Sequence, residues 1–244
     1  MSATNVLATA ARVLAQLRHD RRTLALVLVV PPALLTLLRY VFDASPATFA
    51  RIGPPLVGFF PLIVMFLITS IAMLRERTTG TLERLMSLPL AKLDLLLGYG
   101  LAFALLAALQ VAVTSTVAFW WLGVHTSGSV LAVAALAVAN AVLGMSLGLF
   151  LSAFASTEFQ AVQFMPAVLF PQVLLCGLLT PREHMPHALR IASDALPVTY
   201  AYDALTRVTG GSTGARLWLD IAVTLGAILL ALMLGAATLR RRTP

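Results

Sequence analysis

The chain has 244 residues, of which 59% are hydrophobic and 11% are charged, and it contains one cysteine, Cys176. This composition excludes an ordinary soluble globular protein and is typical of a protein that crosses a membrane several times. The formal net charge of +7 comes from basic residues at the ends of apolar runs, so it indicates orientation in a bilayer rather than nucleic-acid binding. A single cysteine excludes an internal disulfide and a site of several cysteine ligands.

Residues 3–20 predict an amphipathic helix that lies in the membrane interface before the first span. A secretory signal is the competing interpretation. The basic region is too long for one, and no A-x-A cleavage site follows the next apolar run, so the interfacial helix is favoured.

Six apolar runs predict an all-α polytopic membrane protein with six transmembrane helices in one domain, 1–244. Five of the runs reach the roughly 20 residues that cross a hydrocarbon core of about 30 Å. The first run contains Pro31-Pro32 and reaches this length only if its last residues contribute. The expected spans are 23–42, 53–74, 95–122, 130–154, 161–180 and 217–239.

The distribution of basic residues predicts the orientation. With the N-terminus inside, eleven of the 17 Lys and Arg residues lie in inner segments. The positive-inside rule therefore places both termini in the cytosol of a cell whose cytoplasmic (inner) membrane holds the chain. Trp120, Trp121 and Trp218 then fall at the outer interface, where tryptophan is enriched.

Segment 75–89 is a charged, amphipathic stretch between the second and third apolar runs. After Thr81, a suitable N-cap, Leu82 and Leu85 fall on one helical face, and Pro89 stops the helix. A short helix that lies flat on the cytosolic side with its charges exposed is suited to contact another protein. The residues expected at this contact are Arg75, Glu76, Arg77, Thr81, Leu82, Glu83, Arg84, Leu85 and Pro89.

Glu158 lies in the cytosolic turn before the fifth run. N-capping of the next helix by Ser156 or Thr157 is the structural interpretation of this turn. A second contact with the same partner is the functional alternative for Glu158.

The connection 181–211 contains Pro181, Pro186 and Pro197, which divide it into two short helical pieces. Each piece is about 15 Å long, too short to cross, so we expect a re-entrant helical hairpin that follows Gly177 and dips into the outer leaflet. Asp203 and Arg207 are spaced to form an i, i+4 ion pair.

Several residues invite a chemical interpretation. The run 144–148 matches the hydrolase pattern G-x-S-x-G, but it lies deep in an apolar run, so a G-x-x-x-G helix contact is favoured. Asn140 and Phe60 are candidates for a substrate path, although an interhelical hydrogen bond is the favoured role of Asn140. His184 and His187 are better explained as solvated cap residues than as metal ligands, and no metal site is predicted.

The sequence contains no Walker A pattern, so the chain cannot itself bind ATP in a P-loop. No acidic, basic or histidine side chain lies in the middle of an expected span, which argues against a proton- or ion-coupled carrier. Energy for transport would then have to arrive through segment 75–89.

The stretch Arg75-Glu76-Arg77-Thr78-Thr79-Gly80-Thr81-Leu82-Glu83-Arg84-Leu85, followed by Leu88-Pro89-Leu90, resembles the membrane subunits of type-2 ABC exporters. These include the daunorubicin-exporter-like and nodulation-factor-exporter-like permeases. A second similar stretch runs from Cys176 to Pro186 and is followed by Leu196-Pro197. The resemblance covers essentially the whole chain.

The resemblance implies that segment 75–89 is a coupling helix that docks on a separate ABC ATP-binding subunit. That subunit would hold ATP and Mg, and this chain would bind no cofactor. It also implies a second permease, either an identical or a sister subunit. The apolar spans favour a hydrophobic or amphipathic substrate such as a drug or lipid. The alternatives are a stand-alone secondary transporter and an intramembrane enzyme with Ser146 as its nucleophile.

Overall fold

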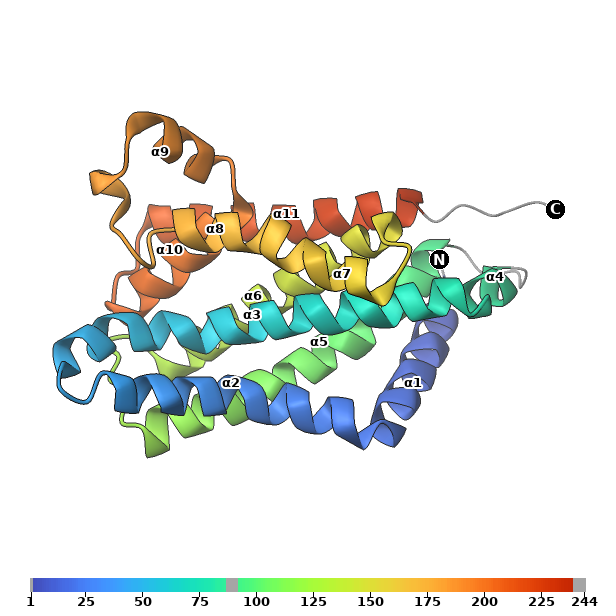
Figure 1. Ribbon diagram of the computed structural model, residues 1–244, viewed down its shortest axis with the longest axis horizontal. Coiled ribbons are helices and arrows are strands. Elements are labelled where there is room, and N and C mark those ends of the chain that lie inside the picture. Colours follow the sequence, from blue (N-terminus) through green and yellow to red (C-terminus); the bar gives the residue numbers. More distant parts are fainter. Residues whose placement is uncertain (1, 87–91, 239–244) are drawn as a thin grey trace.

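The computed structural model describes residues 2–86 and 92–238, and in this part of the chain every regular element is a helix (Figure 1). The elements are α1 (Ala3–His19), α2 (Arg21–Val41), α3 (Pro46–Thr78), α4 (Thr81–Met86), α5 (Lys92–Thr116), the π-helical turn η1 (Val117–Trp121), α6 (Val130–Leu151), the 3₁₀ turn η2 (Ser152–Phe154), α7 (Glu158–Phe164), the π-helical turn η3 (Met165–Leu169), α8 (Phe170–Leu175), the 3₁₀ turn η4 (Arg182–His184), α9 (His187–Asp194), α10 (Pro197–Thr209) and α11 (Ala215–Thr238).

Five helical segments among the described residues are long and apolar enough to cross a membrane. They match the first four predicted spans and the sixth, and they cover Arg21–Val41, Pro46–Thr78, Leu93–Trp121, Val130–Phe154 and Ala215–Thr238. The interfacial helix expected at 3–20 is α1.

The fifth predicted span, 161–180, is divided among α7, η3 and α8, and regular helix ends at Leu175. Pro166 lies in η3 and Pro171 near the start of α8. Proline donates no backbone hydrogen bond, and π-helical turns commonly form where the regular pattern of hydrogen bonds is interrupted. The six-span layout is therefore not confirmed as six uniform helices.

Helix α3 is longer than the predicted span 53–74. It has 33 residues, which at 1.5 Å per residue is about 50 Å, and it begins at Pro46 in the first turn rather than at Pro54. It also continues through Thr78. The charged segment 75–89 is thus not one helix, because its first four residues form the end of α3.

The contact between α3 and α6 is very close. A Cβ atom at Gly144 would lie 2.1 Å from the carbonyl oxygen of Leu62, and one at Gly148 would lie 2.4 Å from that of Phe66. The predicted G-x-x-x-G contact is confirmed. Ser146 lies between the two glycines inside α6, where its hydroxyl donates to the Val142 carbonyl at 2.8 Å, so this run is not the strand-to-helix turn that a hydrolase elbow needs.

Helix α2 remains continuous through Pro31 and Pro32 with help from α5. Pro31 has no N–H to offer the carbonyl of Val27, four residues earlier in the helix. The Nε2 atom of Gln110, a fully buried side chain on α5, donates to this carbonyl at 3.0 Å. A polar side chain inside an apolar bundle thereby satisfies the acceptor that the proline leaves free.

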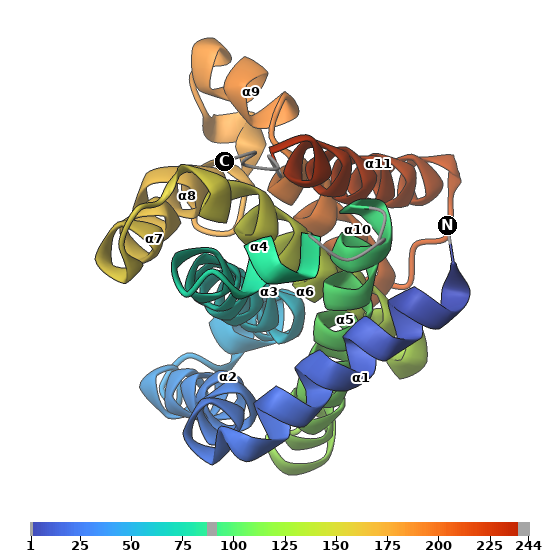
Figure 2. The ribbon, with the colours of Figure 1, turned by 90° about the vertical axis from the view of Figure 1, so that its right-hand side faces the viewer.

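The bundle has two distinct ends. At one end lie α1, α4 and the last turn of α11, and at the other lie the α2–α3 connection, α9 and α10 (Figure 1). Viewed along the bundle, α3 and α6 occupy the middle and α2, α7 and α11 lie around them (Figure 2). Helix α4 is therefore far from the predicted re-entrant pieces.

Candidate functional site

The chain turns sharply between α3 and α4, which lies across the axis of α3 (Figure 2). Gly80 has a φ of +72°, a left-handed conformation that glycine adopts without a steric penalty. The Thr79 N–H and hydroxyl both donate to the carbonyl of Arg75, at 2.9 and 2.8 Å. Thr81 is not the N-cap that the sequence predicts. It is the first residue of α4, and its hydroxyl lies 3.0 Å from that of Thr79.

Helix α4 has the predicted apolar face. Leu82 is 4% exposed and belongs to the hydrophobic core, Leu85 packs against that core, and Arg84 is exposed. Pro89 and the side chain of Glu83 lie outside what the structure describes. Burial of Leu82 attaches α4 to the end of the bundle.

Arg75 joins the end of α3 to the start of α7. Its Nε and Nη2 atoms donate to the two carboxylate oxygens of Glu158 at 2.7 and 3.1 Å, a bidentate pair across 83 positions of sequence. This pairing lowers the pKa of the Glu158 carboxyl below its ordinary value, mainly through the hydrogen bond from Arg75. Thr157 caps α7 by accepting from the Gln160 N–H at 3.2 Å, as one interpretation of this turn predicts.

The next residue in sequence, Glu76, pairs with a different helix. Its Oε1 atom lies 3.4 Å from the Nη1 atom of Arg12 on α1. Arg12 also donates to the hydroxyl of Tyr99 on α5, and its guanidinium carbon lies 5.5 Å from the centroid of that ring. We call Arg12, Arg75, Glu76, Tyr99 and Glu158 the junction cluster.

Arg77 is the third consecutive charged residue at this end of α3. It is half-buried, and its Nε and Nη2 atoms have no acceptor among the described residues.

The junction cluster links three helices, α1, α5 and α7, to the last turn of α3. It is suited to hold the last turn of α3 in a fixed position relative to the bundle.

The predicted re-entrant segment divides where its prolines indicate. Gly177 has a φ of +103°, Pro181 precedes η4, Pro186 precedes α9, and Pro197 is the first residue of α10. The two short helices are thus confirmed as helices. Their depth in a membrane is not tested.

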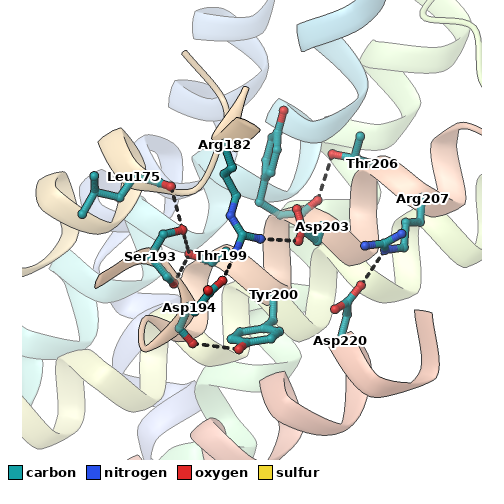
Figure 3. Close-up of polar contacts among 11 residues, drawn as sticks. Leu175, Arg182, Ser193, Asp194, Thr199, Tyr200, Asp203, Thr206, Arg207 and Asp220 are labelled. Carbon is teal, nitrogen blue, oxygen red and sulfur yellow. Dashed lines mark hydrogen bonds and ion pairs between the residues drawn. The ribbon is translucent and has the colours of Figure 1, made fainter. Parts of the chain in front are cut away.

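The predicted i, i+4 ion pair of Asp203 with Arg207 is wrong, because each of these residues pairs with another partner. Arg182 contacts both Asp194 and Asp203, the latter at 2.9 Å, and Arg207 donates to Asp220 on α11 at 2.8 Å (Figure 3). Asp220 is only 4% exposed, so its charge requires a close cationic partner. Tertiary partners therefore replace the local one.

The hairpin is closed by uncharged groups as well. The Ser193 hydroxyl donates to the Leu175 carbonyl at 2.9 Å and lies 3.1 Å from the Thr199 hydroxyl (Figure 3). Both side chains are fully buried. These bonds attach α9 and α10 to the end of α8.

The two candidate residues for a substrate path differ in their burial. Asn140 is 1% exposed, and its amide donates to the Ala201 carbonyl on α10 at 3.4 Å, so the predicted interhelical hydrogen bond is confirmed. Phe60, on α3, is half-buried and packs against the hydrophobic core of the bundle. A role of either residue in a substrate path stays a prediction.

Comparison with known proteins identifies one family. The family model described as "ABC-2 type transporter" matches residues 4–209. Two similar relatives are described as probable multidrug ABC transporter permeases of Escherichia coli (strain K12). YbhR is 27% identical over 158 residues, covering 64% of this chain and 42% of the relative. YbhS is 26% identical over 168 residues, covering 68% and 45%.

A third relative is ABC transporter G family member 20 of Dictyostelium discoideum. It is 25% identical over 194 residues, which make up 78% of this chain and 27% of that protein. The matched part of the chain thus spans less than half the length of each of these three relatives.

Proposed function

The chain belongs to the ABC-2 type transporter family as a multi-pass permease, and we propose that it forms part of an ATP-driven exporter in the cytoplasmic membrane. A separate ATP-binding subunit, which holds ATP and Mg, supplies the energy. The substrate is a hydrophobic or amphipathic molecule such as a drug or lipid. The descriptions of the two Escherichia coli relatives as probable multidrug permeases support this substrate class.

The observation that carries this proposal is the attachment of α4 to the bundle. Leu82 and Leu85 anchor the helix, while the exposed Arg84 and the neighbouring Glu83 contact the ATP-binding subunit. Arg75 and Glu76 already bind Glu158 and Arg12 within the chain. Their part in coupling is therefore to transmit movement of α4 to α7 and α1.

We propose a membrane layout in which α1, α4 and both termini face the cytosol. The excess of basic residues in the inner segments supports this orientation. Segment α7–η3–α8 is the fifth membrane-embedded segment, and α9 and α10 form the re-entrant part at the outer face. Two permeases, identical or sister subunits, assemble with two ATP-binding subunits, and the substrate passes between the permeases.

Reconstituted vesicles containing the chain and its ATP-binding partner provide the test. Export of a lipophilic dye should require ATP hydrolysis and should persist when the proton gradient is collapsed. Glu83→Lys should leave the assembly intact and its ATPase active while export falls by about tenfold, because the charge that contacts the partner is reversed. Glu183→Lys, a matched reversal at the opposite end of the bundle, should leave export unchanged. Export without nucleotide, or unaltered export by Glu83→Lys, would refute the coupling role.

A further inference from the structure

A groove with a cavity volume of about 630 Å³ lies beside the junction cluster, between α1, α2 and α3. Most of its wall is apolar. Leu26 and Val30 line it from α2, and Val64, Ile68 and Ile71 line it from α3. Its volume is within the range of about 300–1,000 Å³ that is usual for sites of drug-sized molecules. The wall therefore fits a lipophilic molecule.

One end of the groove is polar, with three charged residues in its lining, Asp20, Arg75 and Glu76. The charge of Arg75 is compensated by the bidentate contact with Glu158. The Oε1 atom of Glu76 contacts Arg12, but its Oε2 atom is buried and has no donor among the described residues. The three carboxylates at this end, Asp20, Glu76 and Glu158, therefore exceed the two guanidinium groups, Arg12 and Arg75, by one negative charge.

Asp20 supplies the excess negative charge. Its carboxylate accepts hydrogen bonds from the N–H and hydroxyl of Thr23, at 3.1 and 2.6 Å, and these lower its pKa, so it remains ionised at neutral pH. Two aromatic side chains, Tyr99 and Phe103, also line the groove. Arg12 lies over the Tyr99 ring, so this ring already contacts a cation of the chain itself.

From these contacts we infer that the groove binds a lipophilic cation, whose positive charge lies against Glu76 and Asp20 and whose apolar body lies along α2 and α3. An anionic amphiphile would bring its charge toward two carboxylates. An uncharged molecule would bring no positive charge to these carboxylates. The inference rests on the proposed export function, because it names the class of cargo, but the binding itself needs neither ATP nor a partner.

Equilibrium binding of radiolabelled tetraphenylphosphonium to the full chain in lipid nanodiscs tests the inference, with empty nanodiscs as the reference. Binding should be saturable. Glu76→Gln should weaken it by about tenfold or more, because the ligand cation loses a carboxylate charge in a desolvated site. Glu183→Gln, the same change at an exposed site outside the groove, should have no effect.

A second pair of variants tests the location without altering the junction cluster. Leu26 and Leu37 are both on α2 and similarly exposed, at 61% and 60%, but only Leu26 lines the groove. Leu26→Trp should fill the groove and abolish saturable binding, whereas Leu37→Trp should leave it unchanged. Uncharged triphenylphosphine oxide should displace the cation at least about tenfold less effectively than unlabelled tetraphenylphosphonium.

The inference is overturned if binding does not exceed that of empty nanodiscs, if Leu26→Trp binds as the wild type does, or if the uncharged competitor is equally effective. Saturable binding that these variants abolish, in a protein that fails to export in vesicles, would keep the site and refute the proposed export function. The two outcomes are therefore distinguishable.

Discussion

Arg75 and Glu76 are adjacent in sequence but bind different helices of the bundle. Arg75 contacts Glu158 on α7, and Glu76 contacts Arg12 on α1. Successive residues on a helix point about 100° apart, so two neighbouring charges can connect one helix to two others. The last turn of α3 is therefore connected to both α1 and α7.

Exchanging the charges of the Arg75–Glu158 pair should separate its role in coupling from its role in stability. The side chains are 58% and 53% exposed, so the pair contributes at most about 1 kcal/mol to folding. Arg75→Glu and Glu158→Arg should each reduce export in reconstituted vesicles several-fold, with little change in unfolding temperature. The double variant should recover most of the activity. A double variant no better than either single one would indicate that Glu158 contacts the partner instead.

The pH dependence of this pair follows from the lowered pKa of Glu158. A carboxyl whose pKa is lower in the folded state stabilises that state above its ordinary pKa of about 4.3. The stabilisation is lost as the pH falls through the lowered folded value. The difference in unfolding temperature between wild type and Glu158→Gln should therefore be constant from about pH 8 to 5 and disappear at lower pH. A difference that already declines between pH 7 and 6 would contradict the assignment.

Among the elements, α3 and α6 approach closely at Gly144. Gly144→Ala would place a Cβ atom 2.1 Å from the Leu62 carbonyl oxygen, so the helices would have to move apart, at a cost of about 1–3 kcal/mol. The unfolding temperature of the purified chain should fall accordingly. Gly226→Ala on α11 is the matched control, since its Cβ would meet no atom within 4 Å. Equal unfolding temperatures for the two variants would show that the contact is adaptable.

The bond from Gln110 to the Val27 carbonyl predicts a thermodynamic coupling between Gln110 and Pro31. Gln110→Met should destabilise α2 by about 1 kcal/mol, seen as faster amide exchange around Val27, because the carbonyl loses its donor. In a Pro31→Ala background the same substitution should cost less, since the alanine restores the helical N–H donor that proline lacks. A double-mutant cycle with no interaction between the two sites would contradict this role.

The helix boundaries show which features a sequence can indicate. Pro186 and Pro197 act through their own backbone, so the start of each outer helix is predictable from local chemistry. Pro54 has the same chemistry but lies inside α3, because close packing there outweighs its local preference.

The side-chain partners are less predictable for the same reason. Asp203 has Arg207 one turn away, yet it pairs with Arg182, 21 positions earlier in the sequence. Gln110 and the Val27 carbonyl are 83 positions apart, and a polar residue in an apolar run signals only that some partner must exist. Local spacing cannot indicate which helix supplies that partner.

In the whole molecule, two groups of ion pairs lie at opposite ends of the bundle. The junction cluster and the groove lie at the end with α1 and α4, and the Arg182 and Asp220 pairs belong to the segment around α9 and α10 at the other end (Figures 1 and 3). A ligand in the groove would contact Glu76 directly. Binding would therefore act on the same residue that connects α3 to α1, which gives cargo a physical route to influence the position of α4.

This arrangement requires that the α4 end face the cytosol, which the accessibility of introduced cysteines can test. Cys176 is fully buried and can be replaced by serine to give a background without thiols. Thr78→Cys lies at the exposed end of α3 near α4, whereas Ala44→Cys and Glu183→Cys are exposed at the opposite end. A membrane-impermeant maleimide added to intact cells should label positions 44 and 183, and should label position 78 only after permeabilisation. Labelling of position 78 in intact cells would show that the orientation is the reverse of the proposed one. Helix α4 would then be unable to contact a cytosolic ATP-binding subunit.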